Sequence, residues 1–200
     1  MRKAVTHLKN SDPIMAAIIE RHGPCRIQYG QPTFAALTES IVYQQLAGAA
    51  AAAIFRRFTD LTGLPLVPAG VLKLSDEQMR SAGLSKQKLS YIRDLAERVA
   101  DGRVRFDHLH ELTDDEVIAE LTQVKGIGPW TAQMFLMFTL KRMDVLPTGD
   151  LGIQSAIKKH YRKRKLPKPA DMEKLARKWV PYRTIACWYL WKCVDAKEKD

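Results

Sequence analysis

Apolar residues recur every three to four positions along most of the chain, which is the spacing of one buried face of an α-helix. The segments "IMAAIIERHG", "KQKLSYIRDLAERVADG" and "EVIAELTQV" all show this spacing. No segment shows the sustained alternation of apolar and polar residues that is typical of a β-strand. The pattern therefore predicts a nearly all-α fold without internal repeats.

Helix-start signals mark the beginnings of several of these segments. Asp12-Pro13 combines an N-cap residue with a first-turn proline. The sequences "SDEQ" (75–78) and "TDDE" (113–116) both fit the capping box, in which Ser or Thr pairs with Gln or Glu three residues later. Residues 32–58 read as one long helix or two, and "TGLPLVPAG" (62–70) predicts a loop because it is rich in proline and glycine.

The composition is that of a soluble globular protein, with 46% hydrophobic and 27% charged residues among 200. No apolar run approaches the roughly 18 residues that would span a bilayer, and the N-terminus lacks the apolar segment of a signal peptide. We therefore expect an intracellular protein without a membrane partner, whose three cysteines are reduced thiols. A four-cysteine iron–sulfur cluster is excluded by count.

The net charge of +10 favours a polyanionic partner, and nucleic acid is the commonest one for a soluble chain. Part of this charge lies in "KKHYRKRKLPK", residues 158–168. Such a run is usually a solvated helix end or loop, so it adds little by itself. On charge alone, a basic protein without a nucleic-acid partner remains an alternative.

The stretch "VKGIGPWTAQ" (124–133) predicts a tight hairpin between two helices, with Pro129 in the first turn of the second. Glycines tolerate positive φ and leave their amides uncovered, and amides at a helix start bind phosphate oxygens. The pattern is that of a helix-hairpin-helix element, which positions a DNA backbone without reading its bases. An ordinary helix–turn–helix connection is the alternative. The candidate DNA-binding residues of the hairpin are Lys125, Gly126, Ile127, Gly128 and Thr131.

Asp150 lies twenty residues after Trp130, in "LPTGDLG", directly before a predicted helix. Taken alone, it fits a helix N-cap better than a catalytic group. The two roles are compatible, because the helix dipole and the first amides of a helix favour a charged carboxylate at this position.

The hairpin, the Gly/Pro-rich loop and the following aspartate together resemble the helix-hairpin-helix-GPD superfamily of DNA base-excision glycosylases, and within it the AlkA-like 3-methyladenine DNA glycosylase II family. The similarity extends from about Asp12 to Trp191. Its most specific parts are "IVYQQLAG", "GLSKQK", "VKGIGPWTAQMF", "LPTGDLG" and "WVPYRTIACWYLW". The resemblance implies an all-α, two-lobed fold with the active cleft between the lobes. Residues 1–30 and 147–200 would form one lobe, and 31–146 the other, with the helix-hairpin-helix at about 116–141.

By this resemblance, Asp150 is the catalytic carboxylate. Breaking an N-glycosidic bond builds oxocarbenium character on the deoxyribose, which a nearby carboxylate stabilises. Trp130 occupies the position where bifunctional members of the superfamily have a lysine. The chain therefore resembles the monofunctional branch, which hydrolyses the bond and leaves the strand uncut.

The resemblance also assigns residues to the handling of a flipped base. Trp130, Met134 and Trp191 match positions that line the base pocket, where aromatic faces stack on a cationic base. Leu46 matches the side chain that fills the gap left by the flipped base, with Gln45 beside it. Lys86 and Lys88, in "GLSKQK", are candidates for phosphate contacts, and we expect Arg183 to be structural.

The implied reaction is the hydrolytic release of 3-methyladenine and 7-methylguanine from duplex DNA, which initiates base excision repair. Hypoxanthine is a further candidate. We expect a monomer that acts without a cofactor or catalytic metal, although the hairpin carbonyls can hold a structural monovalent cation. It would work in the cytoplasm, on the nucleoid, in a bacterium or archaeon, and in the nucleus of a eukaryote. The β-rich N-terminal domain of some relatives is not found in these residues, so we expect a different damage range.

Two other functions are alternatives. A bifunctional glycosylase/lyase for oxidised bases would need a nucleophilic amine that position 130 does not supply. A non-catalytic DNA-binding module that recognises damage or DNA structure would need the hairpin but not Asp150.

Overall fold

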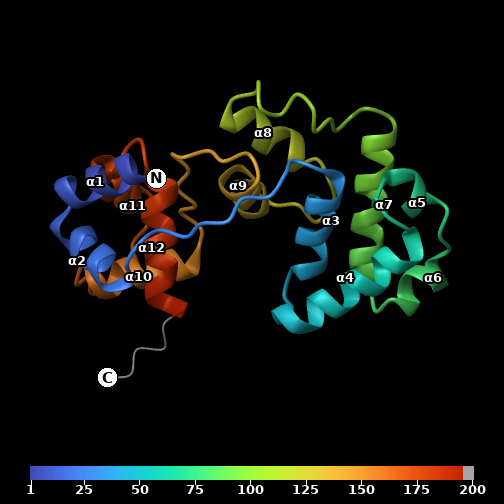
Figure 1. Ribbon diagram of the computed structural model, residues 1–200, viewed down its shortest axis with the longest axis horizontal. Helices are drawn as coiled ribbons and strands as arrows, with labels where there is room; N and C mark the ends of the chain where they lie inside the picture. Colours follow the sequence, from blue (N-terminus) through green and yellow to red (C-terminus); the bar gives the residue numbers. More distant parts are fainter. Residues whose placement is uncertain (196–200) are drawn as a thin grey trace. The chain divides into compact units, whose positions relative to one another are not determined.

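The computed structural model describes residues 1–195, and the last five residues of the predicted terminal lobe lie outside this range. Within it, the regular structure is helical and contains no strand, so the all-α prediction is confirmed. None of these helices is long and apolar enough to cross a membrane. The chain forms two compact units (Figure 1). We call Met1–Tyr29 with Lys141–Asp200 the terminal unit, and Gly30–Leu140 the central unit.

The terminal unit is built around its last helix. Helix α12 packs against α10 and α2, while α1 packs against α2 and the short 3-10 helix η1. The side chains of Trp179 and Tyr189 fill its core and are fully buried. The elements are α1 (Arg2–Ser11), α2 (Pro13–His22), α10 (Leu151–His160), α11 (Pro169–Ala176), η1 (Arg177–Trp179) and α12 (Arg183–Asp195).

Asp12 is fully buried and joins three parts of the terminal unit. As predicted, it is the N-cap of α2, where its carboxylate accepts the Ile14 N–H at 3.0 Å. The same carboxylate accepts the Tyr161 hydroxyl at 2.5 Å and the Trp179 indole N–H at 2.8 Å, and the Lys178 ammonium lies 3.1 Å away. A buried charge is tolerated when it is paired and hydrogen-bonded in this way.

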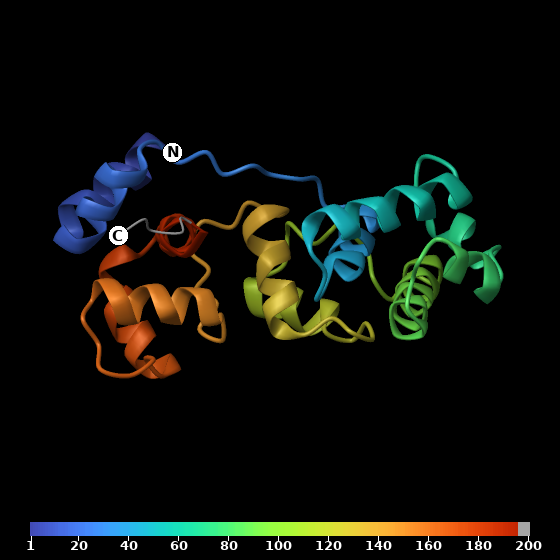
Figure 2. The same cartoon turned by 90° about the horizontal axis from the view of Figure 1, so that it is seen from below.

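The central unit places helix α7 among α3, α5 and α6, and α8 lies beside α9 (Figures 1 and 2). The capping boxes at Ser75 and Thr113 are both formed, as predicted. Residues 32–58 form two helices, and the predicted loop at 62–70 already contains the start of α5, because Pro68 suits a first helical turn. The elements are α3 (Phe34–Tyr43), α4 (Gly48–Thr62), α5 (Pro68–Leu72), α6 (Asp76–Ser81), α7 (Lys86–Ala100), α8 (Asp114–Leu121) and α9 (Pro129–Phe138).

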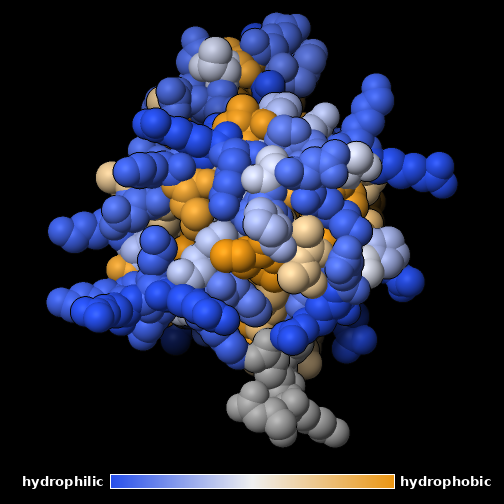
Figure 3. Space-filling model, turned by 90° about the vertical axis from the view of Figure 1, so that its left-hand side faces the viewer, coloured by the Kyte–Doolittle hydropathy of each residue, from blue (hydrophilic) through white to orange (hydrophobic). Residues whose placement is uncertain are grey.

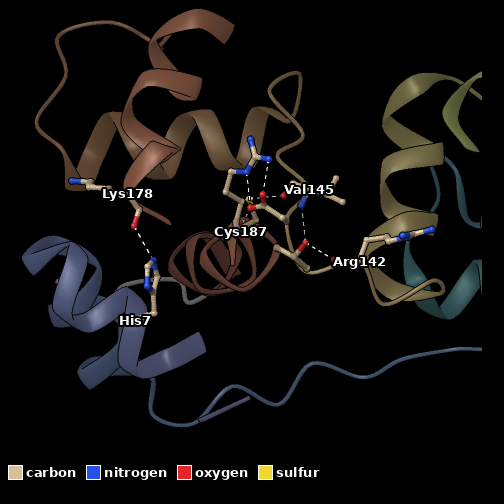
Figure 4. A network of polar contacts seen from close by, with 8 residues as sticks. His7, Arg142, Val145, Lys178 and Cys187 are labelled. Atoms are coloured by element: carbon tan, nitrogen blue, oxygen red, sulfur yellow. Dashed lines mark hydrogen bonds and ion pairs between the residues drawn. The ribbon is translucent and has the colours of Figure 1, made fainter. Parts of the chain in front are cut away.

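The boundary between the units follows Leu140, six residues before the predicted boundary after Leu146. The intervening segment belongs to the terminal unit because it bonds to the start of α12 (Figure 4). The Thr184 hydroxyl donates to the Arg142 carbonyl at 2.7 Å and accepts the Val145 N–H at 3.1 Å. Arg183 makes two hydrogen bonds, of 2.7 and 2.9 Å, to the carboxylate of Asp144, so it has the structural role expected of it.

Candidate active site and DNA-contact residues

Asp150 is held in one position by two hydrogen bonds to the same carboxylate oxygen. It is the N-cap of α10, where its Oδ1 accepts the Ile153 N–H at 2.7 Å. The indole N–H of Trp191, on α12, donates to Oδ1 at 3.0 Å. The side chain is only 8% exposed. Hydrogen bonds to a charged acceptor are stronger than neutral ones, so this carboxylate is fixed in place before any substrate arrives.

Gly152 explains how the Trp191 ring comes so close to Asp150. A Cβ added at this glycine would lie 3.1 Å from the Asp150 Oδ1 and 3.3 Å from Cδ1 of Trp191. Both distances are shorter than ordinary van der Waals contact. The second glycine of "LPTGDLG" therefore leaves room for the indole ring beside the carboxylate.

The buried thiol of Cys187, on α12, interacts electrostatically with Asp150. Burial raises the pKa of the Cys187 thiol, and the negative charge of Asp150 raises it further, so this neighbour stays neutral. All three cysteines are free, as expected. Among the described residues, no group of three or more His, Cys, Asp or Glu side chains is placed to hold a metal ion.

The hairpin between α8 and α9 is shaped by two residues of α7. Gly126 has a φ of 79° and lies against the ring of Tyr91, which a Cβ at this position would overlap. Asp94 accepts the Lys125 N–H at 2.9 Å and the Nε–H of Arg98 at 2.8 Å. Burial alone would raise the pKa of Asp94, but these donors outweigh it and hold the pKa below its ordinary value.

The hairpin leaves two backbone donors for a ligand. The Ile127 N–H bonds to the Val124 carbonyl at 3.1 Å, and the Ile127 side chain is buried. Within residues 1–195, the amides of Gly126 and Gly128 have no intramolecular acceptor. Because Gly128 is the N-cap of α9, its amide lies at the positive end of a helix dipole. This is the arrangement that binds a phosphate oxygen.

A hollow of about 440 Å³ lies in the central unit beside the hairpin, a volume in the range of small-ligand pockets. It brings together four of the predicted residues. Trp130 is 48% exposed, so much of its ring faces outward, whereas Thr131 is buried. The lining residues are Ser40, Tyr43, Gln44, Gln45, Trp130, Thr131 and Met134.

The other predicted contact residues lie on the surface. Leu46 is 40% exposed, so its side chain is accessible in the turn after α3. Lys86 is exposed in the first turn of α7. The Lys125 ammonium is also exposed and lies 3.7 Å from Asp94, at the outer limit of an ion pair. The Lys88 ammonium, in contrast, already bonds to two backbone carbonyls.

Ser40 and Tyr43 were not among the predicted residues, and neither was the hydrogen bond between Trp191 and Asp150. Ser40 and Tyr43 share one face of α3 by their spacing and Gln44 follows directly, so the predicted contact at Gln45 could have led back to them. No local signal joins Trp191 to a residue 41 positions earlier.

Comparison with known proteins identifies the family. Residues 38–182 match the model of the HhH-GPD superfamily of base excision DNA repair proteins. DNA-3-methyladenine glycosylase 1 of Schizosaccharomyces pombe is 33% identical, over 96% of this chain and 87% of its own. The structure of the S. pombe 3-methyladenine DNA glycosylase Mag1 in complex with abasic DNA superimposes with a TM-score of 0.84 at 33% identity, over 98% of both chains.

A bacterial structure gives the same result. The DNA-3-methyladenine glycosidase of Bacillus halodurans superimposes with a TM-score of 0.86 at 39% identity, over 96% of this chain and 89% of its own. The match thus spans both units and includes the hairpin, Asp150 and most of α12. This chain belongs to the HhH-GPD superfamily of base excision DNA repair proteins.

Proposed function

We propose that this protein is a monofunctional DNA glycosylase that releases alkylated purines, such as 3-methyladenine and 7-methylguanine, from duplex DNA. The observation that carries this proposal is the carboxylate of Asp150, fixed by the Ile153 amide and the Trp191 indole N–H. It supports the proposal together with 33–39% identity to proteins named 3-methyladenine DNA glycosylases.

The chemistry needs one negative charge in a fixed place. The bond between C1′ and the base nitrogen breaks, and its electron pair leaves with the base. Positive charge then develops on the sugar, and the Asp150 carboxylate stabilises it. Water adds to C1′ and loses a proton, which completes the hydrolysis. A base made cationic by alkylation leaves as a neutral molecule, so it needs no strong general acid.

The hollow in the central unit supports a stacking role for the predicted pocket residues. A cationic purine over the exposed face of Trp130 would gain roughly 0.5–2 kcal/mol from the cation–π interaction. Met134, one helical turn later, lines the same hollow. Neutral purines lack this gain, which is a physical reason for preferring alkylated bases.

DNA binding is supported by the Gly126 and Gly128 amides and by the basic charge. Residues 158–168 contribute a second basic surface, around a shallow hollow of about 760 Å³ at the end of α10. The positive charge of this surface contributes salt-dependent affinity for phosphates without base specificity. Figure 3, coloured by hydropathy, shows that the visible face of the terminal unit is largely hydrophilic. The basic residues that line the hollow are Lys158, Lys159, Arg162, Lys163 and Arg164.

Asp150→Asn tests the proposal. Asparagine is as good an N-cap as aspartate, so the variant should fold while losing the negative charge. We expect release of 3-methyladenine and 7-methylguanine from methylated DNA to fall by at least about 100-fold, which is typical for the loss of a preorganised electrostatic group. Binding to an oligonucleotide with an abasic site should change little.

The alternatives predict different results. If the wild-type protein releases neither base while a known alkylpurine glycosylase does, the assignment to alkylation repair is wrong. A non-catalytic module would be unaffected by Asp150→Asn in every assay. A lyase would form a protein–DNA crosslink on reduction with borohydride, which we do not expect because Trp130 replaces the nucleophilic amine.

A further inference from the structure

The turn between α3 and α4 has an unfavourable backbone conformation at a surface position. It consists of residues 44–47 and contains the proposed intercalating side chain, Leu46. Gln45 has a φ of 57°, in the left-handed region that residues with a Cβ rarely adopt. Gln45, Leu46 and Ala47 are all exposed, so packing within the protein does not hold them. Besides the hydrogen bond from the Leu46 N–H to the Tyr43 carbonyl at 3.3 Å, some contact from outside the turn must fix it in this conformation.

Lys88, in the first turn of α7, supplies that contact. Its ammonium donates to the carbonyl of Val42 at 2.5 Å and to the carbonyl of Gln44 at 2.7 Å. These carbonyls belong to the C-terminal end of α3, where the helix leaves its last acceptors without intrahelical donors and where a cation is favourable. Burial lowers the pKa of Lys88, whereas its two carbonyl acceptors favour the charged form.

Gln44 extends this network to the hairpin. Its side-chain N–H donates to the Gly126 carbonyl at 2.9 Å, across a separation of 82 residues. Gly126 is itself fixed against Tyr91, on the same helix as Lys88. One helix, α7, therefore sets the positions of both the turn and the hairpin, and the Gln44 amide joins the two directly.

We propose that Lys88 is a positioning residue for base flipping, which fixes the turn of residues 44–47 relative to the phosphate-binding hairpin. This inference rests on the proposed glycosylase function and on the wedge role of Leu46. An intercalating side chain works only if it meets the base stack at the position where the hairpin holds the strand. Lys88 acts through Leu46 and does not itself need to touch DNA.

Lys88→Met tests the proposal, because it keeps an unbranched side chain of similar length and removes the donors. Under single-turnover conditions, we expect release of 7-methylguanine paired with cytosine to slow at least tenfold. On the same lesion opposite an abasic analogue, where no base pair must be broken, the loss should shrink to about threefold or less. Lys88→Arg, which keeps charged donors, should restore part of the rate. Lys73→Met, an exposed lysine of the same unit, should behave as wild type.

A double-mutant cycle with Leu46→Ala separates positioning from general folding damage. If Lys88 acts through the wedge, Lys88→Met should add less than about twofold to the defect of Leu46→Ala. Independent multiplication of the two defects, or a wild-type rate for Lys88→Met, would overturn the proposal. An equal loss on both opposing bases would do so too. If Lys88→Met does not fold, Lys88→Gln takes its place in the cycle. A wild-type protein that releases no base refutes the glycosylase function instead.

Discussion

Trp191→Phe is the most direct test of how the Asp150 carboxylate is held for its proposed catalytic role. The substitution keeps an aromatic ring in place but removes the indole N–H that lies 3.0 Å from the Asp150 Oδ1. A hydrogen bond to a charged group contributes about 1.5–3 kcal/mol. If this bond orients the carboxylate in the transition state, its loss should slow base release by roughly 10- to 150-fold, at 1.36 kcal/mol per factor of ten. The Ile153 amide still holds the carboxylate, so activity should not vanish.

The assay is single-turnover release of 7-methylguanine, with binding to abasic DNA and thermal unfolding measured in parallel. Trp188→Phe, one helical turn earlier on α12, is the matched control, because this ring packs on Tyr189 and beneath Lys192 instead. It should keep the wild-type rate. The reasoning fails if Trp191→Phe stays within about twofold of wild type, or if it slows the residual reaction of Asp150→Asn by the same factor.

Two predictions concern stability. Gly126→Ala should destabilise the protein by about 1–3 kcal/mol more than Gly102→Ala, and it should weaken binding to abasic DNA. Both glycines have a φ of 79°, but only at Gly126 would an added Cβ meet the ring of Tyr91. Equal free energies of unfolding for the two variants in urea would contradict this prediction. Burial alone would raise the pKa of Asp12, but the hydrogen bonds to its carboxylate and the charge of Lys178 hold the pKa below its ordinary value. The stability that the charged carboxylate contributes is therefore present above about pH 4, and it is lost as the pH falls through the lowered pKa. Asp12→Asn should therefore lower the free energy of unfolding by on the order of 3 kcal/mol at pH 7, and this difference from wild type should narrow below pH 4. A difference that does not depend on pH would refute the role of the Asp12 charge in stability.

Local signals in the sequence predicted local structure well. The N-cap at Asp12, the capping boxes at Ser75 and Thr113, and the cap at Asp150 all depend on residues within a few positions of each other, and all are formed. The helix α1 was not predicted, because its ten residues include few apolar ones.

Features that depend on distant parts of the chain were missed or misplaced. The boundary after Leu140 is set by bonds between Val145 and Thr184, which no periodicity shows. Lys88 was predicted as a candidate phosphate contact, whereas its ammonium bonds to two backbone carbonyls more than 40 residues away in sequence. A lysine that is committed within the protein cannot be told from a solvated one by its neighbours in sequence.

Asp150 as the N-cap of α10 has a consequence for how this protein can change. Active-site charges usually reduce stability, so that removing them makes an enzyme more stable and less active. Here the carboxylate is a favourable cap at the positive end of a helix, where replacement by alanine typically costs about 1 kcal/mol. If Asp150 has the proposed catalytic role, stability and activity favour the same residue, and a substitution that removes the carboxylate brings no gain in stability.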